Sequence, residues 1–201
     1  MSFSVVFCPR FGTACLAAAL ATVSAARKTY AIQDTLRPTS QLTVPFRMPL
    51  RVAGYSIADS GLAGGAVTFS YRGYNVTKLD VFIYQLPVAD TSQSLVSHAL
   101  RDEVESFKRS LPVGLSRGWY DDYRLAFETE EPVSTSAGSV QSFAVATVLT
   151  RGGAGYVSLF YIYALRGMFI KIRLTVPYAD WGANPALNFP TQFIEQVAAS
   201  P

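Results

Sequence analysis

The residues best suited to catalysis or metal binding are few in this sequence. His98 is the single histidine, and Cys8 and Cys15 are the two cysteines. A Ser-His-Asp or Cys-His centre would have to use His98, which lies within a stretch of helical periodicity. A zinc site needs three or four His, Cys or carboxylate ligands, which this inventory hardly supplies. We therefore expect His98 to be a partly exposed structural residue, and we assign no catalytic residue.

Carboxylates gather in one segment of the chain. Asp121 and Asp122 are followed at short distance by Glu128, Glu130 and Glu131. Such a group could bind a hard cation, or could supply a general acid and a general base. The spacing does not match an EF-hand loop. We interpret these residues as solvated surface charge and assign no metal ligand.

Two glycine-rich segments, 61–65 and 152–155, have the composition of phosphate-binding loops. Neither has the strand-loop-helix context or the Lys-Ser/Thr pair of a P-loop, and both precede predicted strands. We predict that both are turns. No cofactor is expected.

Aromatic residues are the remaining candidates for a binding function. Most of the tyrosines and phenylalanines are expected in the core, but Trp119, Tyr120 and Trp181 fall in predicted loops. Large amphipathic rings at a surface are typical of binding interfaces. We predict that Trp119, Tyr120 and Trp181 contact a partner, with both tryptophans at the same end of the sheet.

Composition narrows the classes of protein. Half of the 201 residues are hydrophobic and 15% are charged, which excludes a disordered, highly charged chain. The net charge of +3 is small and its basic residues are dispersed, so no nucleic acid is expected as a partner.

Residues 1–26 are predicted to be a secretory signal peptide. Arg10 precedes an Ala-rich apolar core, and small residues before Arg27 offer a cleavage site. An N-terminal membrane anchor is one alternative, although the apolar core is shorter than a spanning helix. A lipoprotein with Cys15 as the lipidated residue is another. Removal of the leader also removes both cysteines, and no later window predicts a membrane span.

Residues 27–46 are predicted to be an extended lead-in, and residues 47–199 a single α+β domain. We expect a twisted antiparallel sheet of about six strands, formed by an N-terminal hairpin and a C-terminal meander, with helices packed on it. The almost wholly apolar strand 156–165 should be covered on both faces. The predicted strands are 67–71, 79–84, 123–128, 140–150, 156–165 and 168–176.

Two helices are predicted. The longer spans 90–111, beginning at a capping box formed by Asp90 and Gln93 and ending at Pro112 and Gly114. A shorter one near the C-terminus follows two prolines.

Three segments carry a resemblance to known proteins. They are Pro49–Tyr55 (PLRVAGY), Val67–Arg72 (VTFSYR) and Leu79–Tyr84 (LDVFIY). They resemble small exported bacterial proteins of uncharacterised function. The order of elements over residues 45–197 also resembles the α-β-α sandwich of the PsbP/Mog1 type. That resemblance implies an accessory or binding protein and carries over no functional residue.

The sequence therefore predicts a periplasmic or secreted, non-enzymatic accessory or binding protein, whose partner is an envelope protein or a small ligand. One alternative is a periplasmic hydrolase or lyase that uses carboxylates, which predicts converging carboxylates in a pocket. Another is a carrier of an apolar ligand, which predicts a cavity behind strand 156–165.

If the leader is removed as predicted, the exported protein begins at Ala26 or Arg27. N-terminal sequencing of protein recovered from the periplasm or medium tests this expectation. A soluble cytoplasmic form that retains Met1 would contradict it.

Overall fold

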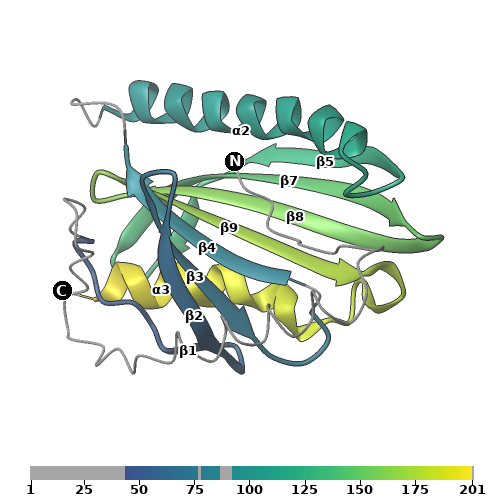
Figure 1. The fold of residues 1–201 in the computed structure, drawn as a ribbon. Helices are drawn as coiled ribbons and strands as arrows, with labels where there is room; N and C mark the ends of the chain where they lie inside the picture. Colours follow the sequence, from purple (N-terminus) through teal and green to yellow (C-terminus); the bar gives the residue numbers. More distant parts are fainter. Residues whose placement is uncertain (1–43, 77, 87–91, 201) are drawn as a thin grey trace.

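A computed structural model describes residues 44–76, 78–86 and 92–200 of the chain. In it, a curled antiparallel sheet lies between helix α2 (Gln93–Ser116) and helix α3 (Phe189–Ala199) (Figure 1). The strand order is β1-β2-β3-β4-β9-β8-β7-β5, and β6 pairs with β7. The strands are β1 (Arg51–Val52), β2 (Tyr55–Ala63), β3 (Ala66–Arg72), β4 (Lys78–Gln85), β5 (Asp122–Glu130), β6 (Val133–Thr135), β7 (Gly138–Arg151), β8 (Ala154–Leu165) and β9 (Met168–Pro177).

Two-residue turns join neighbouring strands at five places. In four of them, at 53–54, 64–65, 152–153 and 166–167, both residues have positive φ, which is typical of the type I′ hairpin that matches the twist of the sheet. Both glycine-rich segments form such turns, at 64–65 and 152–153. Strand β3 pairs antiparallel with β4, β7 with β8, and β8 with β9. These pairings confirm the predicted hairpin and the predicted meander.

Each face of the sheet has its own core. On one face, α3 packs Phe189 and Phe193 against Tyr71, with ring centroids 4.9 Å apart for Tyr71 and Phe189. On the other face, α2 stacks Phe107 on Phe160 of β8 at 4.4 Å. Strand β8 contributes buried residues to both cores, so the prediction that both of its faces are covered is confirmed.

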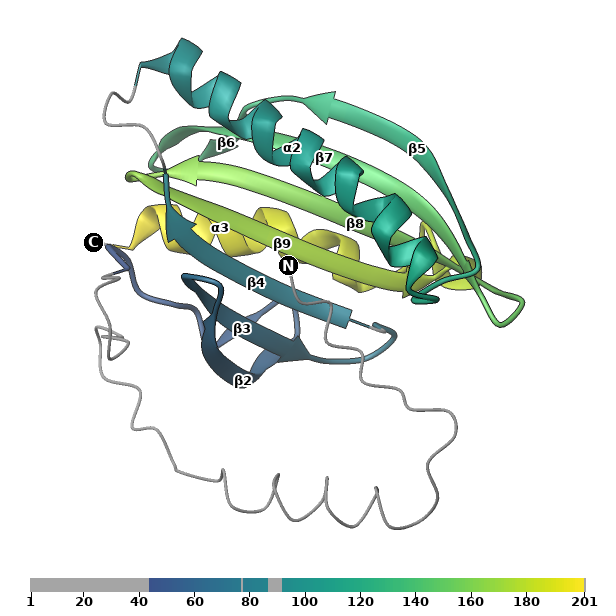
Figure 2. The ribbon, with the colours of Figure 1, turned by 45° about the horizontal axis from the view of Figure 1, so that its top comes forward.

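The α2 layer covers only part of its face. Helix α2 packs mainly on β5, β7 and β8, whereas β2, β3 and β4 lie to one side of it (Figure 2). In the described ranges, neither helix combines the length and apolar character that a membrane span requires.

The α+β class is confirmed, but the sheet has nine strands and not about six. Strands β1, β2 and β6 were not predicted. Beyond its first residues β2 is exposed, and the segment around Asp59 and Gly61 has no alternation of apolar and polar residues. Strand β1 pairs only with Tyr55 and Ser56 of β2, so the rest of β2 is an open edge. A segment that buries neither face lacks the period of two on which sequence prediction depends.

The prediction that α2 ends at Pro112 and Gly114 is wrong, because the helix continues to Ser116. Gly114 serves a different purpose. The Tyr120 side chain folds back against the helix, and its hydroxyl donates a hydrogen bond to the carbonyl of Leu111. A Cβ atom at position 114 would lie 2.5 Å from the Tyr120 hydroxyl oxygen, so only glycine allows this approach. At the other end the helix begins at Gln93, and Asp90 lies outside the described residues.

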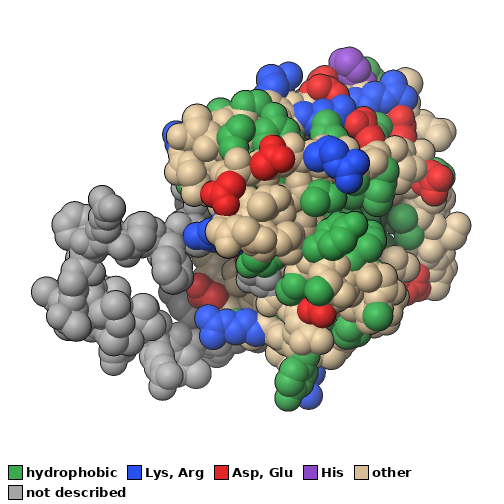
Figure 3. Space-filling model, turned by 90° about the vertical axis from the view of Figure 1, so that its right-hand side faces the viewer, with side chains coloured by type: hydrophobic (Ala, Val, Ile, Leu, Met, Phe, Trp, Pro, Cys, Tyr) green, Lys and Arg blue, Asp and Glu red, His purple; other side chains and the backbone are tan. Residues whose placement is uncertain are grey.

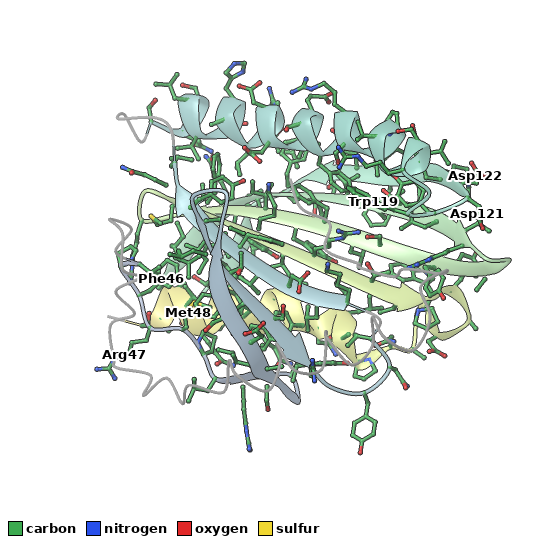
Figure 4. The ribbon with its side chains drawn as sticks, viewed as in Figure 1. Phe46, Arg47, Met48, Trp119, Asp121 and Asp122 are labelled. Atoms are coloured by element: carbon green, nitrogen blue, oxygen red, sulfur yellow. The ribbon has the colours of Figure 1, made fainter. Side chains whose placement is uncertain are left out.

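The core extends into the predicted lead-in. Val44 and Phe46 are buried in the α3 core, so this part of 27–46 belongs to the domain. Arg166 holds it in place by donating hydrogen bonds to the carbonyls of Pro45 and Ala198. Figure 4 shows Arg47 pointing away from the sheet. The predicted leader and residues 27–43 lie outside the described residues.

Because Tyr120 approaches Gly114 closely, we expect Gly114→Ala to change the free energy of unfolding in the opposite direction from most Gly to Ala substitutions in helices. Gly to Ala within a helix ordinarily stabilises by about 1 kcal/mol. Here the added methyl group would displace Tyr120, and we expect Gly114→Ala to lower the free energy of unfolding by about 2 kcal/mol, as overpacking does. Arg109→Ala, at an exposed position of the same helix, is the control. Urea denaturation measures both, and a stabilised Gly114→Ala variant would show that Tyr120 does not pack as described.

Candidate functional site

The carboxylates of 121–131 do not converge. Asp121 accepts a hydrogen bond from the amide of Gly152 at one end of β5. Further along, Glu128 pairs with Lys108 of α2 at 2.5 Å. Within the described part of the chain, no three residues of the His, Cys, Asp and Glu types are grouped as metal ligands. Most of these acids thus tie β5 to its neighbours.

Glu130 forms a second link between β5 and α2. It accepts hydrogen bonds from Ser97 and from the Arg101 guanidinium, whose nearest nitrogen is 2.7 Å away. These two bonds lower the pKa of Glu130, chiefly through Ser97. His98 projects from the outer surface of α2 near Asp102 at 3.6 Å, with 74% of its side chain exposed.

The three predicted partner-binding aromatics have different environments. The start of β5 and the end of β9 lie at the same end of the sheet, which places Trp119 and Trp181 there, as expected. Trp119 lies at the end of α2 (Figure 4), whereas Trp181 follows β9 on the way to α3. Tyr120 is 6% exposed and belongs to the packing of α2, so its ring is not available to a partner.

The surface at this end contains exposed hydrophobic side chains between acidic and basic ones (Figure 3). Trp181 and Tyr178 are the exposed large side chains after β9. Trp119 is half-buried. The guanidinium carbon of Arg117 lies over its ring, 5.3 Å from the ring centroid. Partner binding by Trp119 and Trp181 stays a prediction.

A cavity lies between α2 and the part of the sheet that α2 leaves uncovered. Its volume is about 410 Å³. Strands β4, β8 and β9 form its floor, and α2 forms one wall. The other wall is the tip of the β2–β3 hairpin, which rises toward α2 in Figure 1. The lining residues are Ala63, Gly64, Ala66, Phe82, Tyr84, Glu103, Phe107, Ser110, Phe160, Lys171 and Arg173.

A three-residue polar network crosses the cavity from floor to wall. The Lys171 ammonium lies 2.9 Å from Oε2 of Glu103, and the Tyr84 hydroxyl donates to the same oxygen at 2.7 Å. Lys171 also lies 5.0 Å from the ring centroid of Tyr84 and 5.4 Å from that of Phe160. Burial and the Glu103 carboxylate both raise the pKa of Tyr84, so it stays protonated and donates.

Arg173 lies two residues further along β9 on the same face. Burial lowers the pKa of its guanidinium to about 10, and the nearby Asp80 partly opposes this shift. The guanidinium therefore remains charged at neutral pH. Asp80 lies opposite Arg173 in the register of β4 and β9. Its carboxylate accepts a hydrogen bond from Ser70 at 2.8 Å.

This arrangement is suited to binding more than to acid–base chemistry. Glu103 is the carboxylate that lines the cavity, and it is held by Tyr84 and Lys171. Aromatic and small apolar side chains make up most of the remaining wall. The sequence did contain one signal, since two cations alternate with apolar residues on β9, an interior strand of the sheet.

Comparison with known proteins gives a distant structural similarity. No protein-family profile and no curated protein matches the sequence. The solution structure of cyanobacterial PsbP (CyanoP) from Synechocystis sp. PCC 6803 is similar with a TM-score of 0.47 and 14% identity, covering 70% of this chain and 85% of that one. The crystal structure of PA94, a protein of unknown function from Pseudomonas aeruginosa, has a TM-score of 0.39 and 12% identity, covering 79% and 92%. A protein of the PsbP type, which the order of elements in the sequence resembles, is among these structures.

The polar network predicts a measurable contribution to stability. We expect Tyr84→Phe to lower the free energy of unfolding by about 2 kcal/mol, because it removes a hydrogen bond to a partly buried carboxylate. Tyr74→Phe is the matched control, since Tyr74 is 89% exposed and should change stability by less than about 0.5 kcal/mol. Equal denaturation midpoints for the two variants would contradict the network.

Proposed function

We propose that this protein is an exported, non-enzymatic binding protein, and that the cavity between α2 and the β2–β3 hairpin holds its ligand. The cavity is the observation that supports this proposal. Its volume of about 410 Å³ falls in the range of about 300–1,000 Å³ that small-molecule sites occupy.

The composition of the cavity also supports a ligand site. Phe82, Phe107 and Phe160 supply apolar contact area, while Lys171 and Glu103 supply a few placed polar groups. Specific small-molecule sites combine these same two components, because apolar walls give affinity and sparse polar groups fix orientation. The carrier alternative predicted a cavity behind strand 156–165, and Phe160 belongs to that strand.

The hydrolase or lyase alternative has less support. It requires a second carboxylate that converges on Glu103, whereas Asp121, Glu128 and Glu130 are bonded to Gly152, Lys108 and Arg101 instead. His98 lies on the outer surface of α2 and does not line the cavity.

Binding of an accessory partner at the Trp119 and Trp181 end is a second candidate. Its support is the shared location of the two rings and the exposure of Trp181, which is 39%. The two candidates involve different surfaces, so they can be tested separately.

A neutral fluorescent probe tests the ligand site. We expect N-phenyl-1-naphthylamine to bind the full chain saturably at one site, with a rise in fluorescence as it enters an apolar cavity. Ser110→Trp fills the cavity from α2 and should weaken binding at least about tenfold, which corresponds to about 1.4 kcal/mol. Arg109→Trp adds the same ring at the exposed neighbouring position and should bind as the wild type does.

Circular dichroism verifies that both variants are folded, and Ser110→Leu provides a smaller filling side chain if the tryptophan is not tolerated. The proposal would be overturned if neither N-phenyl-1-naphthylamine nor its 8-sulfonate bound the wild type saturably, or if the position-109 and position-110 variants bound the probe equally.

A further inference from the structure

The charges around the cavity define the class of ligand. We infer that the ligand is an organic anion: an apolar body against the phenylalanines of the cavity, with a carboxylate, sulfonate or phosphate group at Lys171 and Arg173. This inference rests on the proposed ligand site and names the chemistry of its occupant.

The charged side chains that line the cavity are unequal in number. Lys171 and Arg173 of β9 line its floor, and Glu103 of α2 lines its wall. Two cations therefore face one carboxylate, which leaves one positive charge in excess. Lys78 and Asp80 of β4 lie on the same face without lining the cavity, and they pair with each other at 3.2 Å.

Both carboxylates, Asp80 and Glu103, are already engaged by more than one donor. Asp80 accepts from Ser70 at 2.8 Å and pairs with Lys78 at 3.2 Å. Glu103 accepts from Tyr84 and Lys171. The acids thus stabilise the wall of the cavity, and an anionic group that enters it would meet the excess positive charge.

Lys171 lies where the polar network meets the apolar wall of the cavity. Its ammonium has three N–H donors, and one hydrogen bond to Glu103 engages one of them. It lies over the Tyr84 and Phe160 rings, at the boundary between the polar network and the apolar wall. An anion bonded there would leave its apolar body beside Phe160 and Phe107, which are stacked.

The burial of Arg173 also favours an anionic ligand. Removal of water strengthens the attraction between an anion and a cation, because the local dielectric constant is low. Burial of Arg173 disfavours its charged form, as the lowered pKa of about 10 shows, and a neighbouring anion would offset that effect. A neutral or cationic ligand offers no such compensation.

Two probes with the same ring system test the charge of the ligand. The first, 1-anilinonaphthalene-8-sulfonate, is N-phenyl-1-naphthylamine with an added sulfonate. We expect the wild-type chain to bind the sulfonate roughly tenfold more tightly than the neutral probe, since hydrogen bonds to charged groups contribute on this scale. Tighter or equal binding of the neutral probe would overturn the inference while leaving the proposed ligand site in place.

Variants of Lys171 locate the anion. Lys171→Met should bring the ratio of the two affinities close to one, and Lys171→Arg should preserve it because the charge is kept. Lys108→Met removes a cation of α2 that does not line the cavity and should leave the ratio unchanged. An unchanged ratio in Lys171→Met would overturn the inference. Failure of both probes to bind would instead contradict the proposed function itself.

Discussion

One helix is too narrow to cover a whole face of this sheet. The uncovered strands and the cavity on the α2 side both result from that constraint. A helix with its side chains is about 10–12 Å wide, and neighbouring strands are about 4.8 Å apart. Helix α2 can therefore cover two or three strands, and it packs mainly on β5, β7 and β8. The floor formed by β9 and β4 then lies beside the helix and not beneath it. The β2–β3 hairpin approaches from the other side, and the space between them is the cavity.

Partial cover also explains why charged residues are tolerated on interior strands. Lys171 and Arg173 lie on β9, which has a strand on each side. On the face covered by α3 the same strand presents Ile170, Ile172 and Leu174, all fully buried. The polar residues are confined to the face that has room for them, where Glu103 and Asp80 balance part of their charge. A network of this kind fixes the position of α2 over the sheet and at the same time makes the cavity amphipathic, because buried polar groups need defined partners.

The elements with strong periodicity could be predicted from sequence, and those shaped by tertiary contacts could not. The meander of β7, β8 and β9 has dense apolar alternation and was predicted closely, whereas the exposed edge strand β2 has none. From the sequence alone, Gly114 was expected to end the helix, whereas in the structure it leaves room for the Tyr120 ring. The lining of the cavity could not be predicted, because Glu103 and Lys171 are 68 residues apart in the sequence and meet only where α2 lies beside β9. The signals of the cavity within single strands were the two cations on the interior strand β9 and Asp80 on β4. Of the predicted partner-binding residues, Trp119 and Trp181 share one end of the sheet, while Tyr120 is part of the core.

The central claim is that a ligand binds between α2 and the β2–β3 hairpin, and amide hydrogen exchange of the full chain tests it most directly. Exchange is measured with and without saturating 1-anilinonaphthalene-8-sulfonate. The account predicts slower exchange in the segments that line the cavity, namely residues 63–66, 82–84, 103–110 and 171–173 and the part of β8 around Phe160. Exchange near Trp119 and Trp181 should be unchanged, because that end of the sheet is a separate surface. Protection confined to the Trp119 and Trp181 end, or no protection around the cavity at saturation, would contradict the account.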